Sequence, residues 1–335
     1  MATMAIKTYS TKMGFGRALP LLLAVLFLGW MPSPALAAAP DCKLVQLASL
    51  DLMQNARPVV EISIAGKPYH FLIDTGGFAS EIDADVAQQL GLELKDIEGV
   101  EIYDVAGGVA KHYANVDNVV IGGLHADQIK MVVRDRDPDA PAIDGVLGPD
   151  ILSQYDLDFD FAKRKFGLFS PDHCPGQVVY WTTDYATASF EKSDGHIVVP
   201  MTLDGHDIYA TLDTGATNTL IAEHVARTTY GLTDGAPGVE KNEHPAPGEI
   251  IVSRYRFKSL SVGGLAVNNP LIYILPELMA EAFRHKHADK FESDPIYGTQ
   301  LNTASLVLGV NVLSKLHIFI SYKEDKLYLS AAGPR

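Results

Sequence analysis

The heptapeptide Phe71-Leu72-Ile73-Asp74-Thr75-Gly76-Gly77 has a counterpart later in the chain, Ala210-Thr211-Leu212-Asp213-Thr214-Gly215-Ala216. In both copies an apolar run leads into Asp-Thr-Gly, and the two aspartates lie 139 positions apart. A single Asp-Thr-Gly is more often a turn than a functional site, because Asp and Gly are common turn residues. Two copies in matching surroundings indicate two carboxylates that a pseudo-twofold fold would bring together.

The sequence around the two tripeptides is repeated as well. The later blocks, which end in an apolar-apolar-Gly sequence, are separated by an offset of 161 instead of 139. The aligned segments are 62–66 with 201–205, 119–124 with 260–265, and Val146-Leu147-Gly148 with Val307-Leu308-Gly309. Matching blocks in the same order indicate a duplicated unit of roughly 120–140 residues.

Each unit is predicted to be mainly β, because short runs rich in β-branched and aromatic residues alternate with Gly, Asn and Asp. A short helix is predicted over 81–90, ending at Gly91, and a matching one over 221–229. Another short helix is expected after each apolar-apolar-Gly block. The predicted strands of the first unit include 59–64, 69–73, 116–121 and 130–133.

The repeat divides the chain into an N-terminal lobe, 42–174, and a C-terminal lobe, 195–332. Residues 175–194 are interpreted as an inter-lobe linker or an inter-lobe strand, and not as a third domain. The second lobe is longer between its matching blocks, and most of the extra length lies in 276–303. Leu278, Met279, Ala282 and Phe283 suggest a turn or two of amphipathic helix in this surface insertion.

Residues 1–37 have the features of a secretory signal peptide. A basic start precedes the apolar run 19–28, and Ala35-Leu36-Ala37 fits a cleavage site, so cleavage is expected near Ala37. The alternative is an uncleaved membrane anchor, but the run is shorter than the roughly 20 residues of a spanning helix. We therefore predict an exported protein, periplasmic or extracellular, without a stable membrane anchor.

The charge of the chain is acidic. The formal net charge is −14, and removal of the leader with Lys7, Lys12 and Arg17 and no acidic residue changes it to −17. Such a surface disfavours nucleic acid and anionic membranes as partners.

The chain has two cysteines, Cys42 and Cys174. Export permits a disulfide between them; two free thiols or a cysteine-based active site are the alternatives.

The Asp-Thr-Gly motif suits a specific chemistry. Glycine after the aspartate allows a sharp loop and close approach of backbone, and the threonine hydroxyl can bond to the backbone of the partner lobe. Two carboxyls within hydrogen-bond reach cannot both ionise easily, so the pair holds one proton over a range of pH. The ionised member can then take a proton from water while the protonated member polarises a carbonyl.

These motifs resemble those of the retropepsin-like and pepsin-like aspartic proteases, in two copies that cover most of 57–332. The later blocks 145–152 and 306–313 are also similar to that family. The resemblance implies a mainly β, bilobed pepsin-like acid protease fold, with two pseudo-twofold-related, closed barrel-like lobes and short helices. It implies an endopeptidase with catalytic Asp74 and Asp213, supported by Thr75, Gly76, Thr214 and Gly215.

The resemblance further implies that the enzyme needs no metal, no cofactor and no covalent intermediate, and that it acts on a peptide or protein. Because one chain supplies both halves, we expect a monomer; a dimer of tandem units is the alternative. Gly77 departs from the family pattern, which more often has Ala or Ser there, whereas Ala216 is normal. A non-catalytic peptide-binding or scaffold protein with the same fold is the rival function.

The substrate-covering flap of the family is assigned to 102–109, with Gly107 and Gly108 as the turn. Tyr103 is a candidate aromatic cover, although it is equally suited to an ordinary strand. The matching region of the second lobe, 244–251, contains Pro245 and Pro247 and looks less like a hairpin.

Other motifs are not interpreted as metal-binding or phosphate-binding sites. His285-Lys286-His287 lacks the partners of a metal site, and Asp135, Asp137 and Asp139 lack the glycine and closing glutamate of a calcium loop. The Gly-Gly pairs do not have the residues of a phosphate-binding loop.

Overall fold

The computed structural model describes residues 42–54, 57–98, 102–103, 109–135, 143–193, 195–241, 252–276 and 305–333. Some sequence predictions lie outside these residues: the leader 1–37, Gly107, Gly108, the segment 244–251, His285-Lys286-His287, Asp137, Asp139 and residues 277–303. Asp135 is described, and it is exposed. The described residues all belong to the unit Asp41–Arg335.

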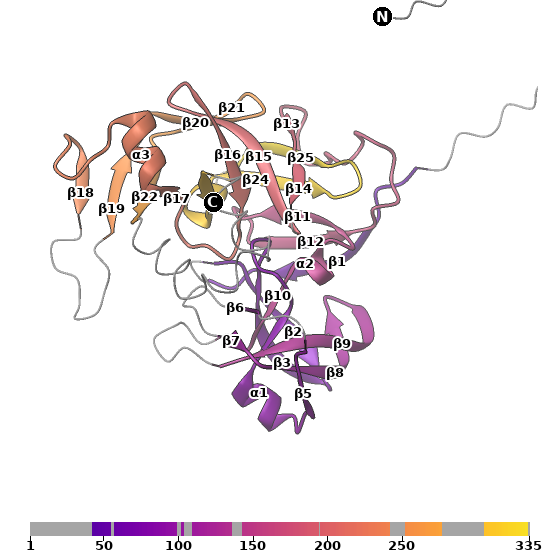
Figure 1. The fold of residues 1–335 in the computed structure, drawn as a ribbon. Helices are drawn as coiled ribbons and strands as arrows, with labels where there is room; N and C mark the ends of the chain where they lie inside the picture. The colour runs from indigo at the N-terminus through magenta and orange to yellow at the C-terminus, as the bar shows by residue number, and fades with distance from the viewer. Residues whose placement is uncertain are drawn as a thin grey trace, which may run out of the picture. The chain divides into compact units, whose positions relative to one another are not determined.

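The first lobe is a closed six-stranded barrel (Figure 1). The ring closes because β2 (Val59–Ile64) pairs with β8 (His112–Ile121) as well as with β3 (Lys67–Ile73). Alternation explains the inside of the barrel, since Val60, Ile62 and Ile64 on β2 are all buried. The barrel strands in spatial order are β2 (Val59–Ile64), β3 (Lys67–Ile73), β10 (Gly145–Leu147), β4 (Glu81–Asp83), β9 (Leu124–Arg134) and β8 (His112–Ile121), with β5 (Leu94–Asp96) beside β8.

The second lobe repeats this pairing with one difference. The hairpin formed by β8 and β9 in the first lobe is interrupted here, because each of its arms is split into two strands. Pro270 lies at the interruption and has no N–H for a ladder bond, but its carbonyl accepts from the Phe257 N–H at 3.0 Å. The strands are β15 (His196–Leu203), β16 (His206–Leu212), β23 (Leu306–Leu308), β17 (Leu220–Ala222), β22 (Leu271–Leu275), β19 (Ser253–Arg256), β20 (Ser259–Val262), β21 (Leu265–Asn268), β18 (Val239–Lys241) and β14 (Glu191–Ser193).

A six-stranded sheet joins the two halves of the chain. Its central pair is β11 (Asp156–Asp160) with β24 (Leu316–Ser321), so Leu157 pairs with Ile320 across the two halves. In Figure 1 the magenta β11 and β12 run beside the yellow β24 and β25. The order is β1 (Gln46–Asp51), β12 (Lys165–Phe169), β11 (Asp156–Asp160), β24 (Leu316–Ser321), β25 (Lys326–Ala331) and β13 (Ala186–Ser189). Segment 175–194, the predicted linker, therefore contributes β13 to this sheet and β14 to the second lobe.

The disulfide between Cys42 and Cys174 is confirmed, and it links positions 132 residues apart. Cys42 lies just before β1 and Cys174 just after β12, two strands that pair with each other. The bridge therefore joins the two ends of the first half of the chain at one edge of the central sheet.

Two of the helix predictions were wrong at their N-termini. Residues 81–83 form β4, and the helix α1 covers Ala84–Gln89; likewise β17 precedes α3, which covers Glu223–Tyr230. Ile82 is fully buried in a strand that pairs on both sides, with β10 and β9. These long-range pairings override the local helical pattern. The short helices expected after the Gly blocks are confirmed as α2 (Pro149–Leu152) and α7 (Val310–Leu313).

The duplication extends to the backbone of matching turns. Ala65 and Asp204, 139 positions apart, have φ angles of 50° and 46°. Arg164 and Asp325, 161 positions apart, have φ angles of 52° and 51°. Such angles are uncommon for residues with a side chain, so their recurrence at the two offsets of the sequence repeat reflects one duplicated fold.

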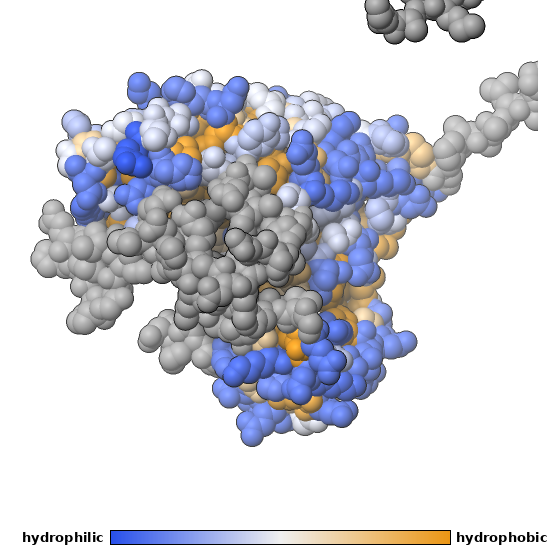
Figure 2. Space-filling view, in the orientation of Figure 1, coloured by the Kyte–Doolittle hydropathy of each residue, from blue (hydrophilic) through white to orange (hydrophobic). Residues whose placement is uncertain are grey.

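The face of the first lobe seen in Figure 2 is largely hydrophilic around α1 and β5. This agrees with the apolar side chains that the barrel buries and with the acidic composition. None of the helices in the described residues is long and apolar enough to cross a membrane.

Candidate active site

The two Asp-Thr-Gly loops follow equivalent strands. The last three residues of β3 and of β16 are buried. Beyond these strands, the Asp74 N–H donates to the Leu147 carbonyl at 3.0 Å, and the Asp213 N–H donates to the Leu308 carbonyl at 3.1 Å. Each apolar-apolar-Gly block therefore holds the start of the Asp loop in its own half.

The two loops bond to each other through their threonines. The Thr75 hydroxyl donates to the Leu212 carbonyl at 2.8 Å, and the Thr214 hydroxyl donates to the Ile73 carbonyl at 2.7 Å. Each hydroxyl also accepts the backbone N–H of the other threonine at 3.1 Å. Both side chains are fully buried, so these four bonds form a symmetric clamp between the lobes.

The glycine of each loop lies against the aspartate of the other. A Cβ on Gly76 would overlap the Asp213 carboxyl, and a Cβ on Gly215 would overlap the Asp74 carboxyl. Glycine is therefore required here by close approach and not by an unusual backbone angle. This packing brings the two carboxyls together.

The environments of the two carboxyls differ. Gly76 donates its N–H to Asp74 Oδ1 at 2.8 Å, and Ala216 donates to Asp213 Oδ1 at 2.9 Å. Burial raises the pKa of Asp213, and the charge of Asp74 adds to this effect and brings it to about 8. Burial also raises the pKa of Asp74, but backbone N–H donors and the positive charge of Arg57 oppose the rise.

This arrangement supports a pair that holds one proton over a range of pH. Each carboxyl changes the pKa of the other, and two negative charges so close in a buried site are unfavourable. The titration belongs to the pair as a whole.

The structure also reveals supports that the sequence reasoning missed. The buried Ser80 hydroxyl donates to Asp150 Oδ1 at 2.8 Å and accepts the Gly148 N–H at 3.0 Å. In the second lobe, the Thr219 hydroxyl and Asn311 make the matching bonds, with Gly309 as the donor. These residues are related by the offsets 139 and 161, so the repeat alignment contained a signal for them.

The predicted flap is described in part. Tyr103 belongs to the short strand β6 (Ile102–Tyr103), which pairs with β7 (Val109–Ala110). The two strands are the arms of a hairpin, and Gly107 and Gly108 lie between them in the sequence. A covering role for Tyr103 stays a prediction.

Three aspartates of β11 form a separate buried cluster. Asp156, Asp158 and Asp160 alternate along the strand and all are buried. Asp158 accepts from His317 at 2.7 Å, and His317 stacks on Trp181 with ring centroids 4.0 Å apart. Because these side chains have partners within the cluster, we interpret them as a structural network and not as an open binding site. Within the described part of the chain, no group of three or more His, Cys, Asp or Glu residues could hold a metal ion.

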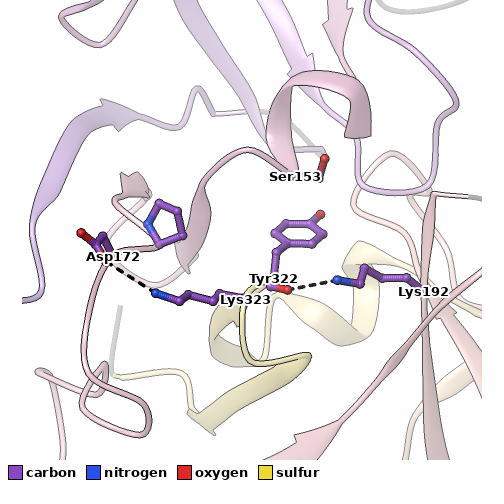
Figure 3. Close-up of a pocket in the computed structure, with 6 residues that line it drawn as sticks. Ser153, Asp172, Lys192, Tyr322 and Lys323 are labelled. Atoms are coloured by element: carbon purple, nitrogen blue, oxygen red, sulfur yellow. Dashed lines mark hydrogen bonds and ion pairs between the residues drawn. The ribbon is translucent and has the colours of Figure 1, made fainter.

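A pocket of about 560 Å³ lies near the central sheet (Figure 3). Lys192 pairs with Asp325 at 2.7 Å, and Lys323 pairs with Asp172 at 3.5 Å. The charges of the two lysines are therefore balanced, and the pocket offers no clear site for a charged ligand. No residue of the Asp-Thr-Gly loops lines it. The lining residues are Ser153, Pro171, Asp172, Lys192, Tyr322 and Lys323.

Comparisons with known proteins agree with this geometry. Residues 60–154 match the family described as "gag-polyprotein putative aspartyl protease", and residues 199–311 match the family described as "Aspartyl protease". The solved structure of an aspartic proteinase from Irpex lacteus is similar in fold, with a TM-score of 0.52 and 15% sequence identity. The similarity covers 85% of this chain and 97% of that one. A search of curated protein sequences found no match.

Proposed function

Because this chain belongs to the retropepsin-like and pepsin-like aspartic proteases, we propose that it is an exported aspartic endopeptidase in which Asp74 and Asp213 are the catalytic pair. The observation that carries this proposal is the reciprocal packing of each loop's glycine on the other loop's carboxyl. The assignment of the chain to the aspartic-type proteases rests on the family matches in both halves.

The proposed reaction uses the single proton of the pair. The ionised carboxylate accepts a proton from a water molecule as the water oxygen bonds to the carbon of the scissile carbonyl. The protonated carboxyl donates its proton to the carbonyl oxygen, which gives a neutral tetrahedral diol. The diol then collapses: the carboxyl that took the water proton donates it to the amide nitrogen, the C–N bond breaks, and the other carboxylate takes a proton from a diol hydroxyl as the new carbonyl forms. The pair again holds one proton.

Both Asp loops support their carboxyl in this reaction. Backbone N–H groups of Gly76 and Ala216 stabilise negative charge on their own aspartate. The threonine clamp holds the two carboxyls at a constant separation, so little reorganisation is needed during the reaction. No group of the protein becomes covalently attached to the substrate in this scheme.

Peptides or proteins are the proposed substrates, and a monomer is the proposed working form because both Asp loops come from one chain. Export is supported by the leader-like 1–37 and by the disulfide Cys42–Cys174. The acidic charge opposes a nucleic-acid partner.

Cleavage of a mixed peptide library between about pH 3 and 8 tests the proposal. Asp74→Asn and Asp213→Asn should each abolish cleavage, because one carboxyl cannot both accept and donate the protons. Asp127→Asn is the matched control, since that side chain is fully exposed on strand β9. Cleavage that persists in either loop variant would contradict the dyad. Peptide binding without cleavage at any pH would favour the non-catalytic rival, and sizing of the active protein tests the monomer.

A further inference from the structure

His196 connects the second lobe to the Asp loop of the first. It is the first residue of β15 and is 1% exposed. Its Nε2 lies 2.9 Å from the Gly76 carbonyl oxygen. Phe78 packs edge-on against the imidazole, with ring centroids 5.2 Å apart. Since a carbonyl oxygen only accepts hydrogen bonds, Nε2 must be the protonated nitrogen of this contact.

The carbonyl that His196 contacts is part of the peptide unit between Gly76 and Gly77. Gly77, which carries the N–H of that same unit, lies against the Asp74 carboxyl, because an added Cβ there would meet Asp74 Oδ2 at 3.2 Å. Its N–H lowers the pKa of Asp74. Hydrogen bonds in a chain polarise one another, so a donor on the carbonyl strengthens donation by the N–H. A stronger N–H donor stabilises the ionised form of the carboxyl that receives it.

The repeat shows that this contact belongs to one lobe. Arg57 occupies the position equivalent to His196 at the offset of 139. Its positive charge also favours the ionised form of Asp74. Burial and the charge of Asp74 raise the pKa of Asp213, whereas the backbone N–H groups of Ala216 and Gly215 lower it. Among the described residues, the charged groups that act on the two carboxyls are Asp74, Asp213 and Arg57.

We propose that His196 is a positioning residue that holds the Gly76–Gly77 peptide with its N–H on Asp74, so that Asp74 is the ionised member of the pair and Asp213 keeps the proton. The proposal rests on the proposed peptidase function. It also explains how a loop with Gly77, which has no side-chain hydroxyl, supports its carboxylate: the support comes through the backbone, from the other lobe.

Substitution of His196 with and without a donor tests this role. His196→Leu removes the hydrogen-bond donor and keeps a side chain of similar size. His196→Asn has an amide, but its side chain is too short to reach the Gly76 carbonyl. His196→Gln can place an amide N–H near the position of Nε2. We expect Leu and Asn to lower kcat by about 3- to 10-fold, the effect of one hydrogen bond, with KM changed less than kcat. Gln should restore most of the rate.

The pH profile separates positioning from a general structural role. Loss of the donor should raise the pKa of the acid limb of kcat/KM by about 0.5–1 unit, whereas a lower fraction of folded protein would reduce the rate equally at all pH values. His125→Leu, at an exposed position of strand β9, should leave the rate and the pH profile unchanged. A folded Leu or Asn variant with the wild-type profile would overturn the proposal, as would a Gln variant that behaves like Leu.

A second readout does not depend on activity. In protein labelled with ¹³C at the aspartate carboxyls, the pair's resonances can be identified by their absence in Asp74→Asn and Asp213→Asn. Their lower apparent pKa should be higher in His196→Asn than in the wild type, with His196→Gln close to the wild type. If the wild type cleaves no peptide, the peptidase function fails, and this titration still decides whether His196 biases the pair; an unchanged titration would overturn the inference alone.

Discussion

Gly215 lies so close to the Asp74 carboxyl that a single added carbon on the glycine would overlap it. The mirror relationship, Gly76 against Asp213, has the same geometry. Each glycine therefore determines where the carboxyl of the other lobe can sit. The third residue of the motif acts between the lobes and not only within its own turn.

Gly215→Ala should displace the Asp74 carboxyl and lower kcat/KM by about 100-fold or more, because misplacement by about 1 Å can cost that much. Overpacking should also lower the free energy of unfolding by about 1–3 kcal/mol. Peptide cleavage and urea unfolding measure the two effects. Gly333→Ala is the control, since an added Cβ meets nothing there. Wild-type activity in Gly215→Ala would contradict the packing argument.

Thr75→Val should destabilise the junction of the lobes. The substitution keeps the shape of the side chain but removes the hydroxyl, and it leaves the Leu212 carbonyl and the Thr214 N–H without their partner in a buried position. We expect a loss of about 2–4 kcal/mol in the free energy of unfolding, because buried groups left unsatisfied cost about 1–3 kcal/mol each. Thr75→Ser, which keeps the hydroxyl, should lose much less. Equal urea midpoints for Val and Ser would argue against the clamp.

The raised pKa of Asp213 should make the protein less stable as the pH rises. The folded pair binds a proton that an unfolded aspartate, with a pKa of 3.8, releases. The contribution of this proton to the free energy of unfolding is therefore fully present below about pH 4 and is lost as the pH increases toward about 8. Asp213→Asn removes this titration. The free energy of unfolding of the variant, relative to that of the wild type, should therefore increase across that pH window, by a few kcal/mol at most.

Urea unfolding of the wild type and Asp213→Asn at several pH values between 4 and 9 measures this difference. Asp127→Asn, at an exposed position, should follow the wild type. A constant difference between wild type and Asp213→Asn at all pH values would mean that the folded state does not hold the proton.

The disulfide should contribute substantially to stability. The bridge Cys42–Cys174 closes a loop of 132 residues, for which chain entropy gives about 4–5 kcal/mol. A double Cys→Ser variant should lose up to this amount in the free energy of unfolding. Reductant should destabilise the wild type to a similar extent and leave the double variant unchanged. A wild type that is insensitive to complete reduction would show that the bridge constrains little in the unfolded chain.

Local sequence patterns were sufficient for much of this protein. The two Asp-Thr-Gly copies, the Gly blocks and the strand-length apolar runs predicted a duplicated, mainly β fold with two carboxylates in equivalent loops. These features are readable because alternating burial and turn glycines are properties of short segments. The pairing of Cys42 with Cys174 was likewise open to prediction, because there were two cysteines and a predicted export signal.

Contacts between distant segments were decided only by the folded chain. Residues 81–83 have a helical pattern but form β4, because strands from two other segments pair with them. His196 had no motif around it, yet it reaches the Gly76 carbonyl, 120 residues earlier in the sequence. Such contacts depend on how the halves pack, and local spacing does not encode that packing. The sequence therefore predicted which carboxylates come in a pair, and the tertiary structure decided which groups surround each one and how the two differ.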